Sequence, residues 1–213
     1  MIFDCDGVLV DSEPLSNASF SRALKAHGLD WSVEETMRRL MGRSLKSCVE
    51  IVEAELGRKL PHDFVEKMQA VTYQSFRDAP LQPVPGVKDA VLALQGAGLE
   101  TCVASSGSVE KMRFTLGLTD LWDLFGGRVY STSEVPRGKP FPDLFLHAAR
   151  SMKEAPGKSV VVEDSVPGIE AACAAGMKAL AYAGAPHADR EGLAAAGGCL
   201  FTDMAQLPKL VLA

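Results

Sequence analysis

The sequence predicts an α/β fold, a parallel sheet with helices on both faces, that carries an inserted helical subdomain. Three observations support this prediction. A short apolar run at residues 1–3 ends in a cluster of acidic residues. Residues 14–76 then show helical spacing without a convincing strand, and from residue 87 onward short apolar runs alternate with helical patterns. Strands alternating with helices form parallel sheets, which bind ligands beyond the carboxyl ends of the strands.

Length and composition suit one such domain with a subdomain. The chain has 213 residues, 47% of them hydrophobic, and a formal net charge of -5. The acidic balance, without a cluster of Lys and Arg, argues against nucleic acid as a partner. No segment approaches the roughly 18 unbroken apolar residues of a membrane span, and the five cysteines show no C-x-x-C spacing. We therefore expect a cytoplasmic monomer without a membrane partner.

The first apolar run reads as a buried strand that presents two carboxylates. Asp4 and Asp6 are two residues apart, so they project from the same face of an extended chain, roughly 6–7 Å apart. Such carboxylates repel each other, so one is protonated or a cation lies between them, and oxygen ligands suit Mg²⁺. Gly7 permits a sharp turn after the strand. Cys5 faces the opposite side, where we expect it to pack in the core. An exposed acidic turn is the alternative that this short motif leaves open.

The segment from residue 14 to residue 82 reads as four helices. Apolar stripes at helical spacing mark the first and third helices, which end at Gly28 and Gly57. Ser32 and Glu35 have capping-box spacing at the start of the second helix, and the fourth begins near Pro61. We therefore expect a helical cap subdomain at 14–82 and a core domain at 1–13 and 83–213, and the two connecting segments form a hinge for cap closure.

After a proline-rich linker at residues 80–86, helices and strands alternate to the end of the chain. The expected helices and strands are, in order, helix 87–96, strand 99–104, helix 109–116, strand 128–131, helix 142–152, strand 159–162, helix 168–175, strand 177–182, a last helix 190–196 and strand 199–201.

Polar residues follow four of the apolar strands. These are Asp4 and Asp6 after the first strand, Ser105 to Ser108, Lys139 in Gly138-Lys139-Pro140, and Glu163-Asp164-Ser165.

These motifs, in this order, resemble those of the haloacid dehalogenase-like hydrolase superfamily. The residues that carry the resemblance are DCDGVLVDSE at 4–13, Ser105, Gly138-Lys139-Pro140 and VVEDS at 161–165. The resemblance covers essentially the whole chain, implies a Rossmann-like core, and is nearest to the branch of β-phosphoglucomutase and the sugar-phosphate phosphatases. The insertion resembles the small helical cap of that superfamily.

The resemblance implies a role for each acidic residue. Asp4 would attack phosphorus and form a phospho-aspartate. Asp6 would protonate the leaving oxygen and then accept a proton from the attacking water. Mg²⁺ would be held by Asp4, the backbone carbonyl of Asp6 and Asp164. Glu163 would be either a further ligand through water or a residue that orders the metal site.

The resemblance also implies positive and polar groups for the phosphate. The Ser105 hydroxyl and neighbouring N–H groups would bind phosphoryl oxygens, and Lys139 would neutralise charge beside Asp4. Ser106 is a candidate for the same site, although Ser106 and Ser108 fit better as caps of the following helix. In the cap, Arg43 and Lys46 could meet the distal part of an anionic substrate. A basic helix start that faces solvent is the alternative.

We expect a Mg²⁺-dependent phosphatase that acts on a small phosphorylated metabolite, a sugar or sugar-acid phosphate. The main alternative is a phosphomutase like β-phosphoglucomutase, but Ser16 stands where those relatives carry a cap-hinge histidine, which favours a phosphatase. Asp6 and Asp164 argue against dehalogenase and phosphonatase chemistry. A catalytically silent binding protein is a remote alternative, because the expected catalytic positions are intact.

Overall fold

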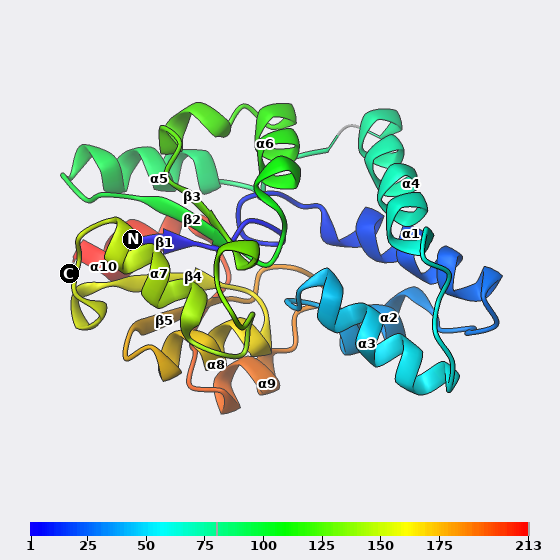
Figure 1. Ribbon diagram of the computed structural model, residues 1–213. Coiled ribbons are helices and arrows are strands. Elements are labelled where there is room, and N and C mark those ends of the chain that lie inside the picture. Colours follow the sequence, from blue (N-terminus) through cyan, green and yellow to red (C-terminus); the bar gives the residue numbers. More distant parts are fainter. Residues whose placement is uncertain (80, 213) are drawn as a thin grey trace.

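The computed structural model describes residues 1–79 and 81–212, and its centre is a six-stranded parallel sheet (Figure 1). The strand order is β3-β2-β1-β4-β5-β6. The strands are β1 (Ile2–Phe3), β2 (Cys102–Ser105), β3 (Val129–Ser131), β4 (Val160–Glu163), β5 (Lys178–Tyr182) and β6 (Cys199–Phe201). The short β1 pairs with both β2 and β4, so the acidic motif leaves the middle of the sheet. The predicted parallel α/β fold is confirmed.

Helices cover both faces of the sheet. One face packs on α5 (Val87–Gly96), α6 (Val109–Leu118) and the C-terminal α10 (Leu207–Leu212). The other face packs on α7 (Asp143–Ser151), α8 (Val166–Ala174) and α9 (Arg190–Ala195). Phe3 contributes to the first apolar cluster and Ile2 to the second, because neighbouring residues of a strand face opposite sides. Cys5 is 1% exposed in the first cluster, so its predicted burial is confirmed.

Two differences from the expected elements have local causes. β2 begins at Cys102 and not at residue 99, because the N–H of Leu99 bonds the carbonyl of Leu94 and so completes the end of α5. The sequence also predicted a last helix at 190–196, whereas α10 follows it. A six-residue helix that contains Pro208 is too short to show a helical period.

The four expected helices of the insertion are present, and they form an apolar cluster of their own. These helices are α1 (Glu13–Ala26), α2 (Val33–Leu40), α3 (Leu45–Leu56) and α4 (Phe64–Asp78). They lie beyond the carboxyl end of β1 (Figure 1). Phe76, near the end of α4, and Leu81 pack in a core cluster instead of the cap cluster. The side-chain oxygen of Ser32 accepts a hydrogen bond from the N–H of Glu35 and so caps α2.

The two segments that join the insertion to the sheet lie side by side. Val10 and Pro83 form an antiparallel bridge, and the N–H of Asp11 donates to the carbonyl of Gln82 at 3.0 Å.

Among the residues that the structure describes, no helix has the length and apolar character needed to span a bilayer.

Candidate active site

The polar residues predicted from the strand ends come together at one edge of the sheet. Asp4 follows β1, Ser105 ends β2, and Asp164 follows β4. A cavity of about 510 Å³ lies between this edge and the insertion, and all three residues line it. Asp4, Ser105 and Asp164 are almost fully buried, so charges at this edge interact in a poorly solvated environment.

Lys139 connects two of these acidic residues. Its Nζ lies 2.6 Å from Asp4 Oδ1 and 2.6 Å from Glu163 Oε1, and its side chain is 1% exposed. Burial raises the pKa of Asp4 to about 7, while attraction by Lys139 opposes that rise. Burial favours a neutral Lys139 amine, but Asp4 and Glu163 outweigh it and raise the lysine pKa above its ordinary value. Lys139 is therefore a fixed positive charge beside Asp4.

Glu163 is held by its own chain. Its Oε2 accepts hydrogen bonds from the N–H groups of Asp164 and Ser165, both at 2.7 Å, and from the Ser165 hydroxyl at 2.9 Å. Gly168 leaves room for this carboxylate, because a Cβ there would lie 1.9 Å from Glu163 Oε1. With Oε1 on Lys139, both oxygens have partners, which favours the second of the two predicted roles, a residue that orders the metal site, over ligation of the metal through water.

Asp164 has the features of a cation ligand. Its Oδ2 is buried and has no hydrogen-bond partner among the described residues. Burial raises the pKa of Asp164 well above its ordinary value, and repulsion by Glu163 adds to this. Gly7, at φ +77°, makes the space for this carboxylate, because a Cβ there would lie 1.8 Å from Oδ2. A cation at this oxygen would supply the missing partner and offset the cost of burying its charge.

The donor set at this point suits Mg²⁺. No group of three His, Cys, Asp or Glu side chains in the described part of the chain is arranged to hold a metal ion. Two carboxylates, Asp4 and Asp164, together with the backbone carbonyl of Asp6, still fit this ion, because Mg²⁺ keeps several waters and needs only one or two protein carboxylates.

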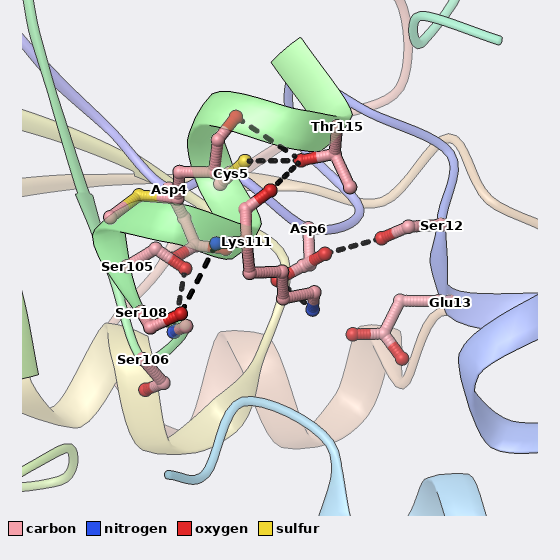
Figure 2. A network of polar contacts seen from close by, with 12 residues as sticks. Asp4, Cys5, Asp6, Ser12, Glu13, Ser105, Ser106, Ser108, Lys111 and Thr115 are labelled. Atoms are coloured by element: carbon pink, nitrogen blue, oxygen red, sulfur yellow. Dashed lines mark hydrogen bonds and ion pairs between the residues drawn. The ribbon is translucent and has the colours of Figure 1, made fainter. Parts of the chain in front are cut away.

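Asp6 is fixed by two donors, Ser12 and Lys111, and the sequence reasoning assigned neither of them (Figure 2). Ser12 donates a hydrogen bond to Asp6 Oδ1, and Lys111 Nζ lies 2.8 Å from Oδ2. Burial alone would raise the pKa of Asp6, but Lys111 and Ser12 outweigh it and hold the pKa below its usual range. One signal could have revealed Lys111. It stands in the first turn of α6, where the helix dipole disfavours a cation, so its position needs another reason.

The three serines near the end of β2 have separate roles. The Ser105 hydroxyl accepts from the N–H of Gly107 at 3.2 Å. Ser108 caps α6 by accepting from the N–H of Lys111, as predicted. Ser106 does not cap that helix, because its hydroxyl donates to the carbonyl of Gly42 in the insertion at 2.9 Å. Ser106 thus joins the sheet edge to the helical insertion across the cavity, and the predicted cap is corrected.

The loop that follows α2 closes over the sheet edge. Gly42 adopts φ +74°, and a Cβ there would lie 2.2 Å from the Ser165 hydroxyl oxygen. Arg43 and Lys46, which the sequence proposed for the distal part of a substrate, both line the cavity. Glycine at position 42 therefore allows the loop to approach α8 closely enough to place these two basic residues in the cavity wall.

The start of α1 adds a polar wall that the sequence reasoning did not assign. Glu13, Ser16 and Asn17 all line the cavity. Their spacing of three and four residues places them on one side of the helix. The sequence shows that the three residues share one side of the helix. It does not show what that side contacts, because only the packing of α1 decides which side meets the cavity.

The whole chain is similar to proteins of one family. Residues 1–176 match haloacid dehalogenase-like hydrolase. The chain is 29% identical over 210 residues to a 6-phosphogluconate phosphatase of Escherichia coli K12, which covers 99% of this chain and 93% of the relative. It is 33% identical over 192 residues to the fructose-1-phosphate phosphatase YqaB of the same organism, with 84% and 94% covered.

Solved structures agree with these sequence relatives. A conserved haloacid dehalogenase-like protein of unknown function from Agrobacterium tumefaciens is 34% identical with a TM-score of 0.81, and the match covers 99% of this chain and 96% of that one. A haloacid dehalogenase family hydrolase from Deinococcus radiodurans, solved with bound phosphate and sodium, is 29% identical with a TM-score of 0.73, with 97% and 91% covered.

Proposed function

The chain belongs to the haloacid dehalogenase-like hydrolase family, and from this premise we propose that it is a Mg²⁺-dependent phosphatase of small phosphorylated metabolites. Its substrate would be a sugar or sugar-acid phosphate, and the reaction would pass through a phospho-aspartate. One observation carries the proposal. Asp4 is paired with the buried Lys139, and Asp6, two residues later, is held separately by Lys111. Two carboxylates in different environments can take different chemical roles.

Asp4 is the proposed nucleophile. Lys139 engages Asp4 Oδ1, which leaves Oδ2 to attack phosphorus, and the ammonium favours the ionised form of the carboxylate. The attack forms a bond between Asp4 and phosphorus and breaks the bond between phosphorus and the ester oxygen. Water then attacks the same phosphorus and regenerates Asp4 with release of inorganic phosphate.

Asp6 is the proposed acid and base. It would give its proton to the leaving ester oxygen and take one from the water that attacks the intermediate. The second role suits an ionised carboxylate held by Lys111 and Ser12. The first role needs a proton, and the negative charge of a bound phosphate beside Asp6 favours the protonated form.

The remaining residues would bind the phosphoryl group. The Ser105 hydroxyl accepts from Gly107, so its own hydrogen is available to a phosphoryl oxygen. Lys139 adds positive charge next to Asp4. Asp4, Asp164 and the Asp6 carbonyl would hold Mg²⁺, which when bound supplies positive charge to phosphoryl oxygens. Arg43 and Lys46, from the insertion, also line the cavity, where they would meet the rest of an anionic substrate.

The proposal is tested by phosphate release from phosphorylated sugars, sugar acids and two-carbon acids, with Mg²⁺ and again with EDTA. A coupled assay for isomerisation of glucose 1-phosphate runs beside it. We expect release that EDTA abolishes and added Mg²⁺ restores. Release that survives EDTA would refute the metal assignment, and isomerisation without release would identify a phosphomutase instead.

The variant Asp4→Asn tests the nucleophile. We expect it to lower kcat on the order of 10³-fold or more, because no other group replaces a missing nucleophile. Asp89→Asn is the matched control, since Asp89 is exposed on α5 and is not among the residues that line the cavity. Thermal unfolding of both variants shows whether the fold is intact. Substantial activity in a folded Asp4→Asn protein would contradict the assignment.

A further inference from the structure

The wall that α1 presents to the cavity lies next to the groups that handle the ester bond. Glu13, Ser16 and Asn17 line the cavity together with Asp4, Asp6 and Lys111. Figure 2 shows the Glu13 carboxylate on the side where the Lys111 ammonium meets Asp6. Charge interactions with both Asp6 and Lys111 act on Glu13, so this wall faces the leaving-group side of the site.

Ser16 offers a hydroxyl that the protein itself does not use. Its Oγ is buried and has no hydrogen-bond partner among the residues that the structure describes. Buried hydroxyls in folded proteins nearly always have a partner, and each such exception needs an explanation. Because Ser16 lines the cavity, a polar group of a bound molecule is the partner that explains it.

Asn17 holds the carboxylate of Glu13 in place. The Asn17 amide nitrogen donates to the backbone carbonyl of Glu13 at 2.9 Å and to its Oε2 at 2.5 Å. Both N–H groups of that amide are thereby used, so Asn17 orients Glu13. Burial raises the pKa of Glu13 to about 7, and the charge of Asp6 contributes to the rise. Glu13 is partly buried, and Asn17 is the one side chain among the described residues that donates to its carboxylate, so a ligand hydroxyl would add a second donor.

We infer that Glu13 and Ser16, with Asn17 as the positioning residue, form a subsite for hydroxyl groups carried by the carbons next to the phosphate ester. A substrate hydroxyl would donate to the Glu13 carboxylate, and a second would exchange hydrogen bonds with Ser16 Oγ. The inference rests on the proposed phosphatase function and narrows its substrates to phosphate esters that carry hydroxyl groups on the carbons next to the ester. A carboxylate in this subsite would be repelled by Glu13, so any second anionic group belongs near Arg43 and Lys46.

The experiment compares two substrates that differ only in hydroxyl groups. They are the 6-phosphate of a six-carbon polyol and n-hexyl phosphate, both assayed with Mg²⁺, and p-nitrophenyl phosphate reports phosphatase activity as such. We expect kcat/KM of the unsubstituted protein to favour the polyol phosphate at least tenfold. Glu13→Gln and Ser16→Ala should each lower the ratio of the two kcat/KM values, Glu13→Gln by about tenfold, because a site built for hydroxyls loses an acceptor or a partner.

Ser21→Ala is the matched control. Ser21 lies on the same helix, and its hydroxyl donates to the carbonyl of Trp31 at 2.7 Å inside the insertion. We expect this variant to keep the substrate ratio of the unsubstituted protein. Thermal unfolding checks that each variant is folded, and if Glu13→Gln fails to fold, Ser16→Ala decides.

Each outcome separates the subsite from the general function. If neither the polyol phosphate nor p-nitrophenyl phosphate releases phosphate with Mg²⁺, the proposed function fails. If phosphate is released but the unsubstituted protein does not prefer the polyol phosphate to n-hexyl phosphate, the subsite is wrong. The subsite is also wrong if folded Glu13→Gln and Ser16→Ala lose activity equally on both alkyl phosphates. A reduced ratio in these two variants and an unchanged ratio in Ser21→Ala would support it.

Discussion

At the scale of single residues, Lys111 has a role in the site that the sequence analysis did not predict. Its ammonium meets Asp6 Oδ2 at 2.8 Å, although the two residues are 105 positions apart. Attraction by Asp6 outweighs the effect of burial and raises the pKa of Lys111 above its ordinary value. Lys111 therefore remains charged over the working pH range and fixes the direction of the Asp6 carboxylate.

Lys111→Met removes this charge while it keeps a long side chain. We expect kcat for an alkyl phosphate to fall by about 10- to 100-fold, because a misplaced acid or base loses part of its contribution. KM should change less, and Lys111→Arg should restore part of the rate. Steady-state kinetics measure this, with Lys88→Met on the exposed face of α5 as the control. If Lys111→Met raises KM but leaves kcat unchanged, Lys111 binds substrate and does not position Asp6.

The raised pKa of the partly buried Glu13 predicts how the stability of the protein depends on pH. Its pKa in the folded protein is about 7, above the value of 4.5 for an unperturbed glutamate, chiefly because of burial. Between these two pKa values the folded state holds more protons than the unfolded state, so stability falls as pH rises from about 4.5 to 7. Above pH 7 the loss is complete, and the difference between the two pKa values puts it on the order of 3 kcal/mol.

Glu13→Gln cannot ionise, so we expect it to lack this loss. The difference in unfolding free energy between Glu13→Gln and the unsubstituted protein should therefore favour the variant more at pH 8 than at pH 5. Urea unfolding at the two pH values measures this difference. Other acidic groups titrate in both proteins and cancel in the comparison. Parallel stability curves would show that Glu13 is not perturbed.

At the scale of elements, the loop between α2 and α3 determines how the insertion meets the sheet. It touches the sheet edge at two points. The Ser106 hydroxyl donates to the Gly42 carbonyl, and a Cβ at Gly42 would strike the Ser165 side chain at the start of α8. These contacts hold Arg43 in the cavity wall, so the loop is part of the site as well as of the insertion.

Gly42→Ala tests this contact, and Gly57→Ala is its matched control. Both glycines have a positive φ, but a Cβ at Gly57 meets nothing within 4 Å, whereas one at Gly42 would lie 2.2 Å from Ser165 Oγ. Both variants should lose about 1 kcal/mol of stability from backbone strain. Only Gly42→Ala should also lower kcat/KM, by about tenfold or more. Equal kinetics in the two variants would show that close approach of the loop is not needed.

At the scale of the whole molecule, the apolar clusters suggest two units of stability. We propose a core of residues 1–13 and 83–213 and a cap of residues 14–82. Nine buried apolar residues of the insertion form a cluster separate from the two that cover the sheet. Phe76 and Leu81 cross this division, because they pack on the core.

Two substitutions of fully buried leucines distinguish one unit from two. Leu24→Ala lies in the cap cluster and Leu116→Ala in a core cluster, and each should destabilise its own unit by about 2–5 kcal/mol. Hydrogen exchange should show that Leu24→Ala loses protection in residues 14–82 while the strands stay protected. Leu116→Ala should lower protection in the sheet. Equal loss throughout in both variants would contradict the proposed division.

The sequence by itself determined the α/β fold, the helical insertion and the strand ends at which the site lies. Each depends on local patterns, such as apolar periodicity and the polar residues directly after a buried strand. Asp4, Ser105, Lys139 and Asp164 could be named this way, because parallel strands bring their carboxyl ends to one edge. Short elements could not be predicted for the same reason, since α10 has too few residues to show a helical period.

Only the tertiary structure decided which distant side chains meet. The pairing of Lys111 with Asp6, the bond from Ser106 to Gly42 and the direction of Glu13 into the cavity depend on how helices pack on the sheet and on each other. Periodicity tells which residues share a face of a helix, but it does not tell what that face touches. Side-chain packing between segments far apart in the chain decides it, and the specificity of the site is built from such contacts.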